Sequence, residues 1–276
     1  MTSNIGVVFP FYYSSGKHEK AVEMLNEAIE SVRPHVKKIV VINDGVKIPE
    51  VRGVQVVNNA TNQGKGFAIK RGLNELLSNP GVKFVVEADA DDDQDTKDIV
   101  KFKKYFDNKH YSEHFMVIGD RYTAPEMQNT SDYRNAINQV QRLIFSKFGY
   151  NIRDSVSGFR GYSRAMATIL NVKLQSKDFG IATEEIVLAY LFDAGIEEIP
   201  LSYAKPRNSF TKSYKLTEVL GGMLKHKDKL VERGLGELVN TLTAVNKQIE
   251  ENAEIVRFKL NGEEFSFKNV GEGYGN

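Results

Sequence analysis

Short runs of apolar residues alternate with segments of helical periodicity along the first half of the chain. The run from Ile5 to Phe9 is followed, from Lys17 to Val32, by a segment whose apolar residues recur every three or four positions. The alternation continues with expected strands at 38–43, 54–57, 83–88 and 115–119, and expected helices at 66–77 and 97–106. Strands that are apolar on both faces and joined by helices are typical of a parallel sheet covered on both sides. We therefore predict an α/β layered fold with a mostly parallel sheet.

The residues that follow four of these strands are polar. They read PFYYS, NDG, EADAD and GDR in chain order. Ligands bind at the carboxyl ends of the strands in such sheets, so we expect the functional site there. The usual nucleotide signatures are absent, because no Gly-x-Gly-x-x-Gly follows the first strand and no Ser or Thr follows the Lys of NQGKG. These absences disfavour NAD binding and ATP hydrolysis.

Six carboxylates lie within the nine residues from Glu87 to Asp95, directly behind an apolar run. A charge run of this kind is often a solvated loop. A calcium loop of the EF-hand type needs Gly at its sixth position and Glu at its twelfth, where this chain has Gln94 and Val100. That loop is excluded. The remaining interpretation is a strand end that presents a small acidic cluster to a metal ion.

Composition narrows the function classes further. The chain has 276 residues, 41% of them hydrophobic and 26% charged, which is enough for one large domain or two small ones. The absence of cysteine excludes disulfides, thiolate zinc sites and cysteine nucleophiles, so a metal needs oxygen or imidazole ligands. A net charge of +1 gives no overall attraction to nucleic acid or membranes.

The sequence shows no membrane or targeting signal. No apolar run approaches the roughly 20 residues of a membrane span, and the first residues lack a basic leader and a small-residue cleavage site. We expect a cytoplasmic protein without an integral membrane span. Peripheral attachment to a membrane is compatible with this expectation.

Six segments carry a family resemblance through their order. They are VVFPFYYS, VVINDG, NQGKGFAIKRGL, EADADDDQDTKDI, VIGDRY and DSVSGFRGYSR, and they cover roughly residues 5–215. In this order the chain resembles the family-two glycosyltransferases with the GT-A fold, especially the polyprenyl-phosphate branch that includes dolichyl-phosphate mannosyltransferase. The resemblance implies a GT-A, Rossmann-like sheet flanked by helices. It also implies a metal-dependent, inverting transfer of a sugar from a nucleotide diphosphate sugar to an acceptor hydroxyl or phosphate.

The same resemblance assigns roles within the acidic strand end. Asp89 and Asp91 match the D-x-D that holds Mg²⁺ or Mn²⁺, and Asp89 also belongs to the donor site. Hard cations prefer oxygen ligands, and such an ion can stabilise the negative charge that grows on a departing diphosphate. Glu87 is expected inside the strand. We expect the other acidic residues to be charges at the start of the following helix, namely Asp92, Asp93 and Asp95.

Further nucleotide-sugar-binding residues follow from the resemblance. Tyr12 offers an aromatic face to the base, and Asp44 accepts hydrogen bonds from base or ribose. Gly64 lets the backbone approach the nucleotide at a helix start that favours anions. The planar guanidinium groups of Arg121 and Arg160 could bind sugar hydroxyls, carboxylates or phosphates. Either arginine could equally be a structural ion-pair partner. Besides Asp89, the expected set is Pro10, Tyr12, Ser14, Asn43, Asp44, Asn62, Gly64, Lys65, Arg121 and Arg160.

A hydroxyl acceptor needs a general base, whereas a phosphate acceptor is already ionised. Glu184 and Glu185 in GIATEEIVLAYL resemble the acidic helix start that supplies the catalytic base in the family. Their side chains point about 100° apart on a helix, so only one can face a cleft directly. Both could instead complement the helix dipole. Asp154, which precedes the SGFR segment, is a third acidic candidate.

The resemblance thins beyond Pro200. We predict a GT-A domain at 1–215, a helical appendix at 216–252, and a hairpin with a tail at 253–276. The basic segment from Lys205 to Lys215 could close over a diphosphate or serve as a linker. Helical apolar spacing recurs from Leu216 to Leu230 and from Leu238 to Ile249. Lysines interrupt the first of these segments, which favours a packed helical appendix over membrane helices.

The C-terminal segment IVRFKLNGEEFSFKNV alternates on both sides of Asn261-Gly262, which predicts a type I′ hairpin. One apolar face would be shared by Phe258, Leu260, Phe265 and Phe267. An isolated hairpin is marginally stable, so we expect it to dock on the main sheet or on a second subunit. We favour a homodimer.

Two rival functions stay open. Asn43, Ser14 and the altered residues after Asp91 suggest a nucleotide-sugar-binding relative that has lost catalysis. A nucleotidyltransferase also uses carboxylate-held metal on an α/β sheet, but PFYYSSGK is a poor match to its Gly-rich basic loop. The acceptors compatible with a glycosyltransferase are a polyprenyl phosphate and a soluble glycan or small molecule.

Overall fold

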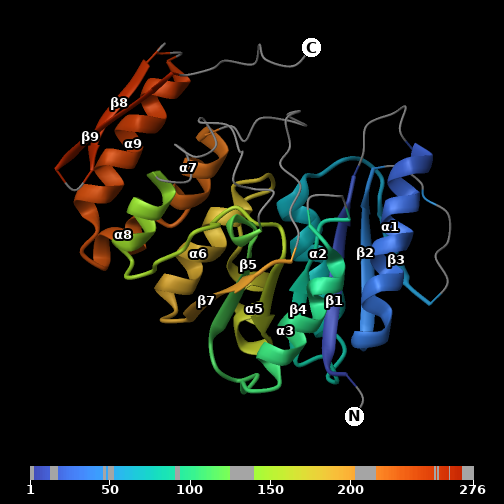
Figure 1. Ribbon diagram of the computed structural model, residues 1–276. Helices are drawn as coiled ribbons and strands as arrows, with labels where there is room; N and C mark the ends of the chain where they lie inside the picture. Colours follow the sequence, from blue (N-terminus) through green and yellow to red (C-terminus); the bar gives the residue numbers. More distant parts are fainter. Residues whose placement is uncertain are drawn as a thin grey trace.

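The computed structural model describes residues 3–12, 18–45, 48, 53–90, 94–124, 140–202, 216–251, 253, 255–260 and 262–268. Within these ranges the chain forms a seven-stranded sheet with helices on both faces and a separate two-stranded sheet near the C-terminus (Figure 1). None of the described helices is both long enough and apolar enough to cross a bilayer.

The large sheet has the strand order β3-β2-β1-β4-β6-β5-β7. Its parallel half consists of β1 (Ile5–Phe11), β2 (Lys38–Asp44), β3 (Gln55–Asn59) and β4 (Phe84–Glu87). The other half contains β5 (Phe115–Asp120), β6 (Arg160–Ser163) and β7 (Gly195–Pro200). Strand β6 runs antiparallel to both β4 and β5, whereas β7 is parallel to β5. The prediction of a mostly parallel α/β sheet is therefore confirmed.

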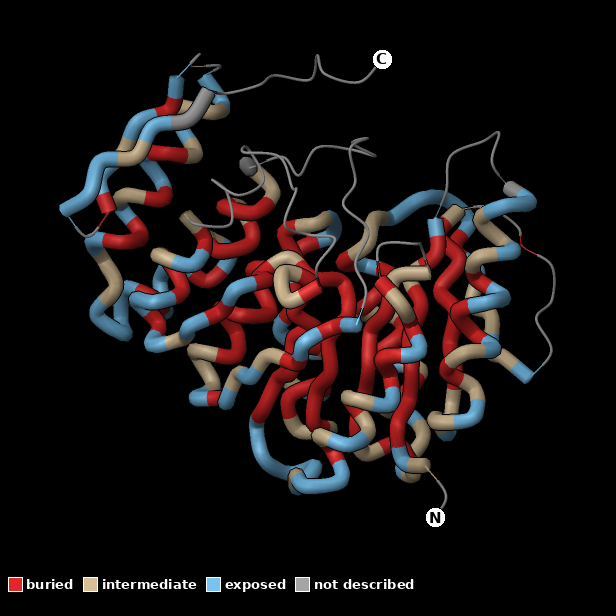
Figure 2. The backbone as a smooth tube through the Cα atoms, viewed as in Figure 1, coloured by how far each residue is buried: buried red, intermediate tan, exposed pale blue. Residues whose placement is uncertain are grey.

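Alternating side chains of the strands fill two apolar layers. Val7 and Phe9 of β1 join a cluster with α1 (His18–Val32) and α3 (Ile99–Phe106), whereas Val8 joins the cluster on the opposite face. That opposite face is covered by α2 (Lys65–Leu77), α5 (Arg164–Lys173) and α6 (Ile181–Leu191). Figure 2 shows the strands as a buried layer between partly exposed helices. Burial on both faces explains why these strands are continuous apolar runs.

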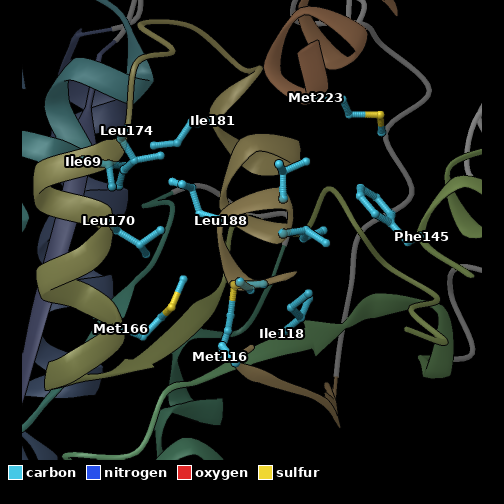
Figure 3. Packing of buried hydrophobic residues seen from close by; sticks show 14 of the residues in the cluster. Ile69, Met116, Ile118, Phe145, Met166, Leu170, Leu174, Ile181, Leu188 and Met223 are labelled. Atoms are coloured by element: carbon cyan, nitrogen blue, oxygen red, sulfur yellow. The ribbon is translucent and has the colours of Figure 1, made fainter. Parts of the chain in front are cut away.

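The second cluster extends from the sheet to the C-terminal helices. Figure 3 shows its side chains converging from α2, α5, α6 and β5. The labelled members include Ile69, Met116, Met166, Leu170, Leu174, Leu188 and Met223. Met223 belongs to α7 (Leu216–Leu224), so this helix packs on the same core as the sheet.

The C-terminal helices differ from the sequence expectation in one respect. The periodic segment from Leu216 to Leu230 was expected to be one helix, but it forms α7 and then α8 (Lys227–Glu232). His226 lies between them, is buried, and begins α8 as its N-cap residue. The next helix, α9 (Gly236–Glu250), agrees with its prediction.

The predicted hairpin is present as β8 (Ile255–Leu260) and β9 (Glu263–Lys268), with a positive φ of 82° at Gly262. It forms a sheet of its own and does not extend the main sheet, so the first of the two expected docking sites is wrong, and docking on a second subunit stays a prediction. Val256 and Leu260 are instead buried in the cluster that contains the apolar face of α9. Gln248 of α9 also makes two hydrogen bonds, each of 3.0 Å, with the backbone of Arg257. In Figure 1 this unit lies at the opposite end of the molecule from α1.

Candidate functional site

The carboxyl ends of β1, β2 and β4 meet at one edge of the sheet. The parallel register places Phe11 beside Asn43 and Val8 beside Glu87. Tyr12 follows β1 and is 49% exposed, so its ring is available to a ligand. Pro10 is the residue before the last of the same strand and is partly buried. Ser14 and Asp91, which the sequence also assigns to the site, lie outside the described residues.

Asp89 follows β4 and is held by a lysine. Lys65, the first residue of α2, places its Nζ atom 2.7 Å and 2.8 Å from the two carboxylate oxygens of Asp89. The Asp89 side chain is partly exposed, with 28% of its surface accessible. A Cβ atom on Gly158 would overlap Oδ2 of Asp89 and would lie 3.0 Å from Lys65 Nζ, so the SGFR segment packs closely against this ion pair. Two separate sequence motifs thus meet the predicted metal ligand.

Asp44 is buried and holds the loop that leads into α2. Its Oδ1 atom accepts hydrogen bonds from Asn59 Nδ2 at 2.8 Å and from the Gln63 amide at 2.9 Å. Its Oδ2 atom accepts from the Gly64 amide at 2.7 Å, and Asn62 Oδ1 accepts from the same amide at 2.9 Å. Since these donors belong to the protein, Asp44 shapes the loop beside the site. Its direct contact with a nucleotide stays a prediction.

Asn43 lies next to this loop support. It is buried, and its Nδ2 atom donates to Asn58 Oδ1 at 2.7 Å. The contact ties the end of β2 to β3, in register with the pairing of these strands. The role of Asn43 toward a nucleotide also stays a prediction.

The start of α2 packs against a turn from a distant part of the chain. The Gly66 amide donates to the Lys177 carbonyl at 2.9 Å. A Cβ atom on Gly64 would overlap the Lys177 carbonyl oxygen, and one on Gly66 would overlap that of Ser176. Glycine is therefore required here because another backbone approaches closely, and Gly64 also has a positive φ of 95°. The two amides donate within the protein, so they differ from the anion-binding helix start that the sequence suggested.

Arg160 lies at the centre of a buried charge network. Its guanidinium donates to Glu185 Oε2 at 2.8 Å and to the carbonyls of residues 155, 157 and 182. Tyr162 donates its hydroxyl to the same Glu185 oxygen at 2.8 Å. Arg160, Tyr162 and Glu185 have no exposed surface. Of the two roles considered for Arg160, the structure shows the ion pair.

Glu87 lies at the edge of this network, inside β4 as expected. One of its carboxylate oxygens lies 3.9 Å from Arg160 Nε. Burial and the negative charge of Glu185 raise the pKa of Glu87 well above its ordinary value. Burial likewise raises the pKa of Glu185, although Arg160 and Tyr162 oppose the shift. The charge of Glu185 therefore disfavours ionisation of Glu87.

Glu184 is also fully buried, but its environment is the opposite. Its carboxylate accepts hydrogen bonds from the amides of Gln175 and Ser176 and from His226 Nε2, at 2.7 to 2.8 Å. Burial alone would raise the pKa of Glu184. The hydrogen bonds from His226, Ser176 and Gln175 together lower this pKa by more, so the net shift is downward. Both predicted base residues thus have protein partners, and their role as a base stays a prediction.

Arg121 forms a second buried ion pair. Its Nε and backbone amide donate to Asp154 Oδ2, at 2.7 Å and 3.0 Å, and its Nη2 donates to Oδ1 at 2.8 Å. The fork geometry is that of a bidentate structural pair. Asp154, the third acidic candidate, is fully buried by it. Near the acidic segment, Asp95 accepts from the Lys97 amide at 2.9 Å and caps the helical turn before α3, which confirms its predicted place.

The Asp89 site fits a hard cation in part. The Lys65 ammonium already sits against both Asp89 oxygens, which shows that a positive charge is accommodated there. Among the described residues no group of three or more His, Asp or Glu side chains could hold a metal ion. A cation at Asp89 would therefore need a further ligand, and Asp91 is the residue that the sequence offers.

Three contributors to the site were not singled out from the sequence. Gly158 stands within a recognised motif, so its close approach to Asp89 could have been suspected. The turn at Ser176–Lys177 and His226 carry no periodic or motif signal, because their importance arises from contacts with residues far away in the chain.

Comparison by sequence finds distant relatives. No family model matches the chain. The chain is 28% identical over 188 residues to an uncharacterized protein of Methanocaldococcus jannaschii. The aligned region covers 65% of this chain and 75% of that protein. It is 28% identical over 152 residues to the UDP-N-acetylglucosamine–dolichyl-phosphate N-acetylglucosaminyltransferase of Methanococcus voltae, which covers 54% of this chain and 58% of that enzyme.

Comparison by structure identifies the fold. Glucosyl-3-phosphoglycerate synthase from Mycobacterium tuberculosis, solved with Mn²⁺, UDP and glucosyl-3-phosphoglycerate, superposes with a TM-score of 0.56 at 16% identity. The superposition covers 96% of this chain and 88% of that one. At this identity the similarity is one of fold, and it confirms the GT-A architecture expected from the sequence.

Proposed function

We propose that this protein is a glycosyltransferase that uses a nucleotide diphosphate sugar as donor. The observation that carries the proposal is the partly exposed Asp89 carboxylate at the carboxyl end of β4, held by Lys65 and closely approached by Gly158. In open α/β sheets this edge is where ligands bind. The GT-A fold and the sequence similarity to an N-acetylglucosaminyltransferase support the same activity.

The donor would bind along the ends of β1, β2 and β4. The exposed ring of Tyr12 offers a stacking surface for the base. The loop that Asp44 fixes would form the adjoining wall, with Asn62 and Lys65 at its end. We assign Pro10, Ser14 and Asn43 to the same pocket from the family motif.

A Mg²⁺ or Mn²⁺ ion would be held by Asp89 together with Asp91, and when bound it neutralises charge on the departing diphosphate. Lys65 prepares this site, because its ammonium balances the charge of Asp89 and orients the carboxylate. Because both are positive, a cation held by Asp89 would disfavour the present contact of Lys65 with both carboxylate oxygens. A displaced ammonium would supply a second positive charge to the diphosphate.

We further propose that the acceptor is an ionised phosphate, such as a polyprenyl phosphate, and that its oxygen attacks the anomeric carbon opposite the diphosphate with inversion. A hydroxyl acceptor would need a base that faces the substrate. Glu184 and Glu185 are both fully buried and hydrogen-bonded to protein groups, which favours an acceptor that has already lost its proton.

Transfer assays test both levels of the proposal. Labelled UDP- and GDP-sugars with Mn²⁺ are offered polyprenyl phosphate, the matching polyprenol and soluble glycans. We expect transfer to the phosphate, and a loss of at least about a hundredfold in Asp89→Asn, comparable to removing one charge-stabilising group. Asp107→Asn is the matched control, because Asp107 is exposed and pairs only locally with Lys103.

Full activity of Asp89→Asn, or of the wild type in EDTA, would contradict the metal site. Transfer to polyprenol alone would contradict the phosphate acceptor while leaving the glycosyltransferase assignment intact. Tight binding of a nucleotide sugar without turnover would instead favour a non-catalytic binding protein.

A further inference from the structure

We infer that Glu184 is a positioning residue for the donor site: it fixes the turn at Gln175–Ser176 against the start of α2 and thereby holds Lys65 in place. This inference rests on the proposed function, because it concerns how the donor site is built. It also replaces the catalytic role that the sequence suggested for Glu184.

Both carboxylate oxygens of Glu184 accept hydrogen bonds from groups of the protein. Oε1 accepts from the Gln175 amide and from His226 Nε2, each at 2.8 Å, and Oε2 accepts from the Ser176 amide at 2.7 Å. An ionised carboxylate only accepts, so His226 Nε2 must carry a proton. The residue is fully buried. Such a carboxylate clamps three donors, and it is poorly suited to taking a proton from an acceptor.

The clamped turn is what α2 rests on. The carbonyl of Lys177 receives the Gly66 amide at 2.9 Å, and the carbonyls of Ser176 and Lys177 occupy the space where Cβ atoms of Gly66 and Gly64 would be. Lys65 lies between these two glycines and reaches Asp89. A shift of the turn therefore shifts Lys65 relative to Asp89.

The third donor comes from the C-terminal helices. His226 lies between α7 and α8, and α7 packs tightly on the start of α6. Thr183 Oγ1 donates to the Val219 carbonyl at 2.7 Å, and a Cβ atom on Gly222 would overlap the Gly180 carbonyl oxygen. The helical appendix is thus connected to the donor site through His226 and Glu184. In the Glu184→Gln variant, the side-chain NH₂ group would replace an oxygen that faces a backbone N–H. At least one of the hydrogen bonds of Glu184 would then be lost.

Three variants test the inference on the full-length protein. Glu184→Gln weakens the clamp by removing at least one of its hydrogen bonds. His226→Leu removes its third donor, whereas His226→Gln keeps an N–H group. The measurements are UDP and GDP affinity by calorimetry with Mn²⁺, KM and kcat for the donor, and thermal stability of each variant.

A positioning role predicts a specific split. Glu184→Gln and His226→Leu should weaken nucleotide binding and raise the donor KM about five- to a hundredfold, with kcat changed much less. His226→Gln should restore most of the affinity. In a Lys65→Met background, Glu184→Gln should add little further loss, because both changes act through the same group.

A catalytic base predicts the reverse. In that case Glu184→Gln lowers kcat by about 10²–10⁴ and leaves nucleotide affinity unchanged, and His226→Leu is harmless to kcat. That result overturns the inference. If Glu184→Gln does not fold, equal nucleotide affinity in His226→Leu and His226→Gln overturns it as well. A wild-type protein that binds no nucleotide overturns the proposed function itself, whereas a wild type that binds and variants that bind equally overturn only this inference.

Discussion

Replacing Glu185 by Ala tests whether this residue is structural or catalytic. The change removes the carboxylate that faces the fully buried Arg160 guanidinium at 2.8 Å and that accepts the Tyr162 hydroxyl. An uncompensated buried charge is strongly destabilising, typically by about 3–5 kcal/mol. Arg160 keeps three backbone acceptors, and Glu87 lies 3.9 Å from its Nε atom. We therefore expect a loss near the lower end of that range, about 3 kcal/mol.

A loss of this size is easily measured. For a domain of this length about 2–4 °C in Tm corresponds to 1 kcal/mol, so Glu185→Ala should melt about 6–12 °C below the wild type. Glu185→Gln keeps the volume and one acceptor oxygen and should lose less. Asp107→Ala, which breaks an exposed pair with Lys103, is the control and should melt like the wild type.

The assay is thermal and urea unfolding of the three variants beside their donor kinetics. The reasoning is refuted if Glu185→Ala melts within 2 °C of the wild type, which corresponds to a loss of at most about 1 kcal/mol, while its turnover falls a hundredfold. That combination would place Glu185 in the chemistry rather than in the core.

Three further predictions concern Glu184, Gly158 and the C-terminal hairpin. The lowered pKa of Glu184 means that its bonds stabilise the fold above about pH 4.3, the pKa of a free glutamate, and lose this effect as pH falls through the lower folded value. The difference in unfolding free energy between wild type and Glu184→Gln should then shrink in urea titrations below pH 4.3, and a constant difference would argue against the clamp. Gly158→Ala should displace the Asp89 carboxylate and weaken Mn²⁺ binding in the presence of UDP, measured by titration, with the fold retained; unchanged Mn²⁺ affinity would contradict the close approach. Deleting the residues after Glu251 should lower the Tm, because the hairpin covers apolar residues of α9. If the hairpin supports a homodimer, the deletion should also shift sedimentation toward a monomer. Identical melting and sedimentation would show that the hairpin is dispensable.

Four of the five strands that the sequence predicts are almost completely buried, and the fifth, β3, is partly exposed. β1, β2, β4 and β5 are apolar on both faces because helices cover both sides of the sheet, so each is a short uninterrupted run. β6 and β7 were not predicted. Their sequences, RGYS and GIEEIP, are polar and short, and only pairing with β4 and β5 makes them strands.

The candidate site likewise has a part that the sequence predicts and a part that it does not. Lys65 and Asp89 each stand in a motif at the end or start of an element, so their convergence follows from parallel strands meeting at one edge. The partners of the two glutamates could not be anticipated. Arg160 is 25 residues from Glu185, and His226 is 42 residues from Glu184, and neither contact leaves a periodic trace in the sequence. Burial in tertiary contacts therefore changed the interpretation of both residues.

The most direct test of the donor site is to locate Mn²⁺ by its anomalous scattering in crystals grown with Mn²⁺ and UDP or GDP. We predict a metal peak in contact with the Asp89 carboxylate, the base beside Tyr12, and the Lys65 ammonium moved from Asp89 toward the diphosphate. A metal and nucleotide bound away from the carboxyl ends of β1, β2 and β4, with the Lys65–Asp89 pair intact, would contradict the account.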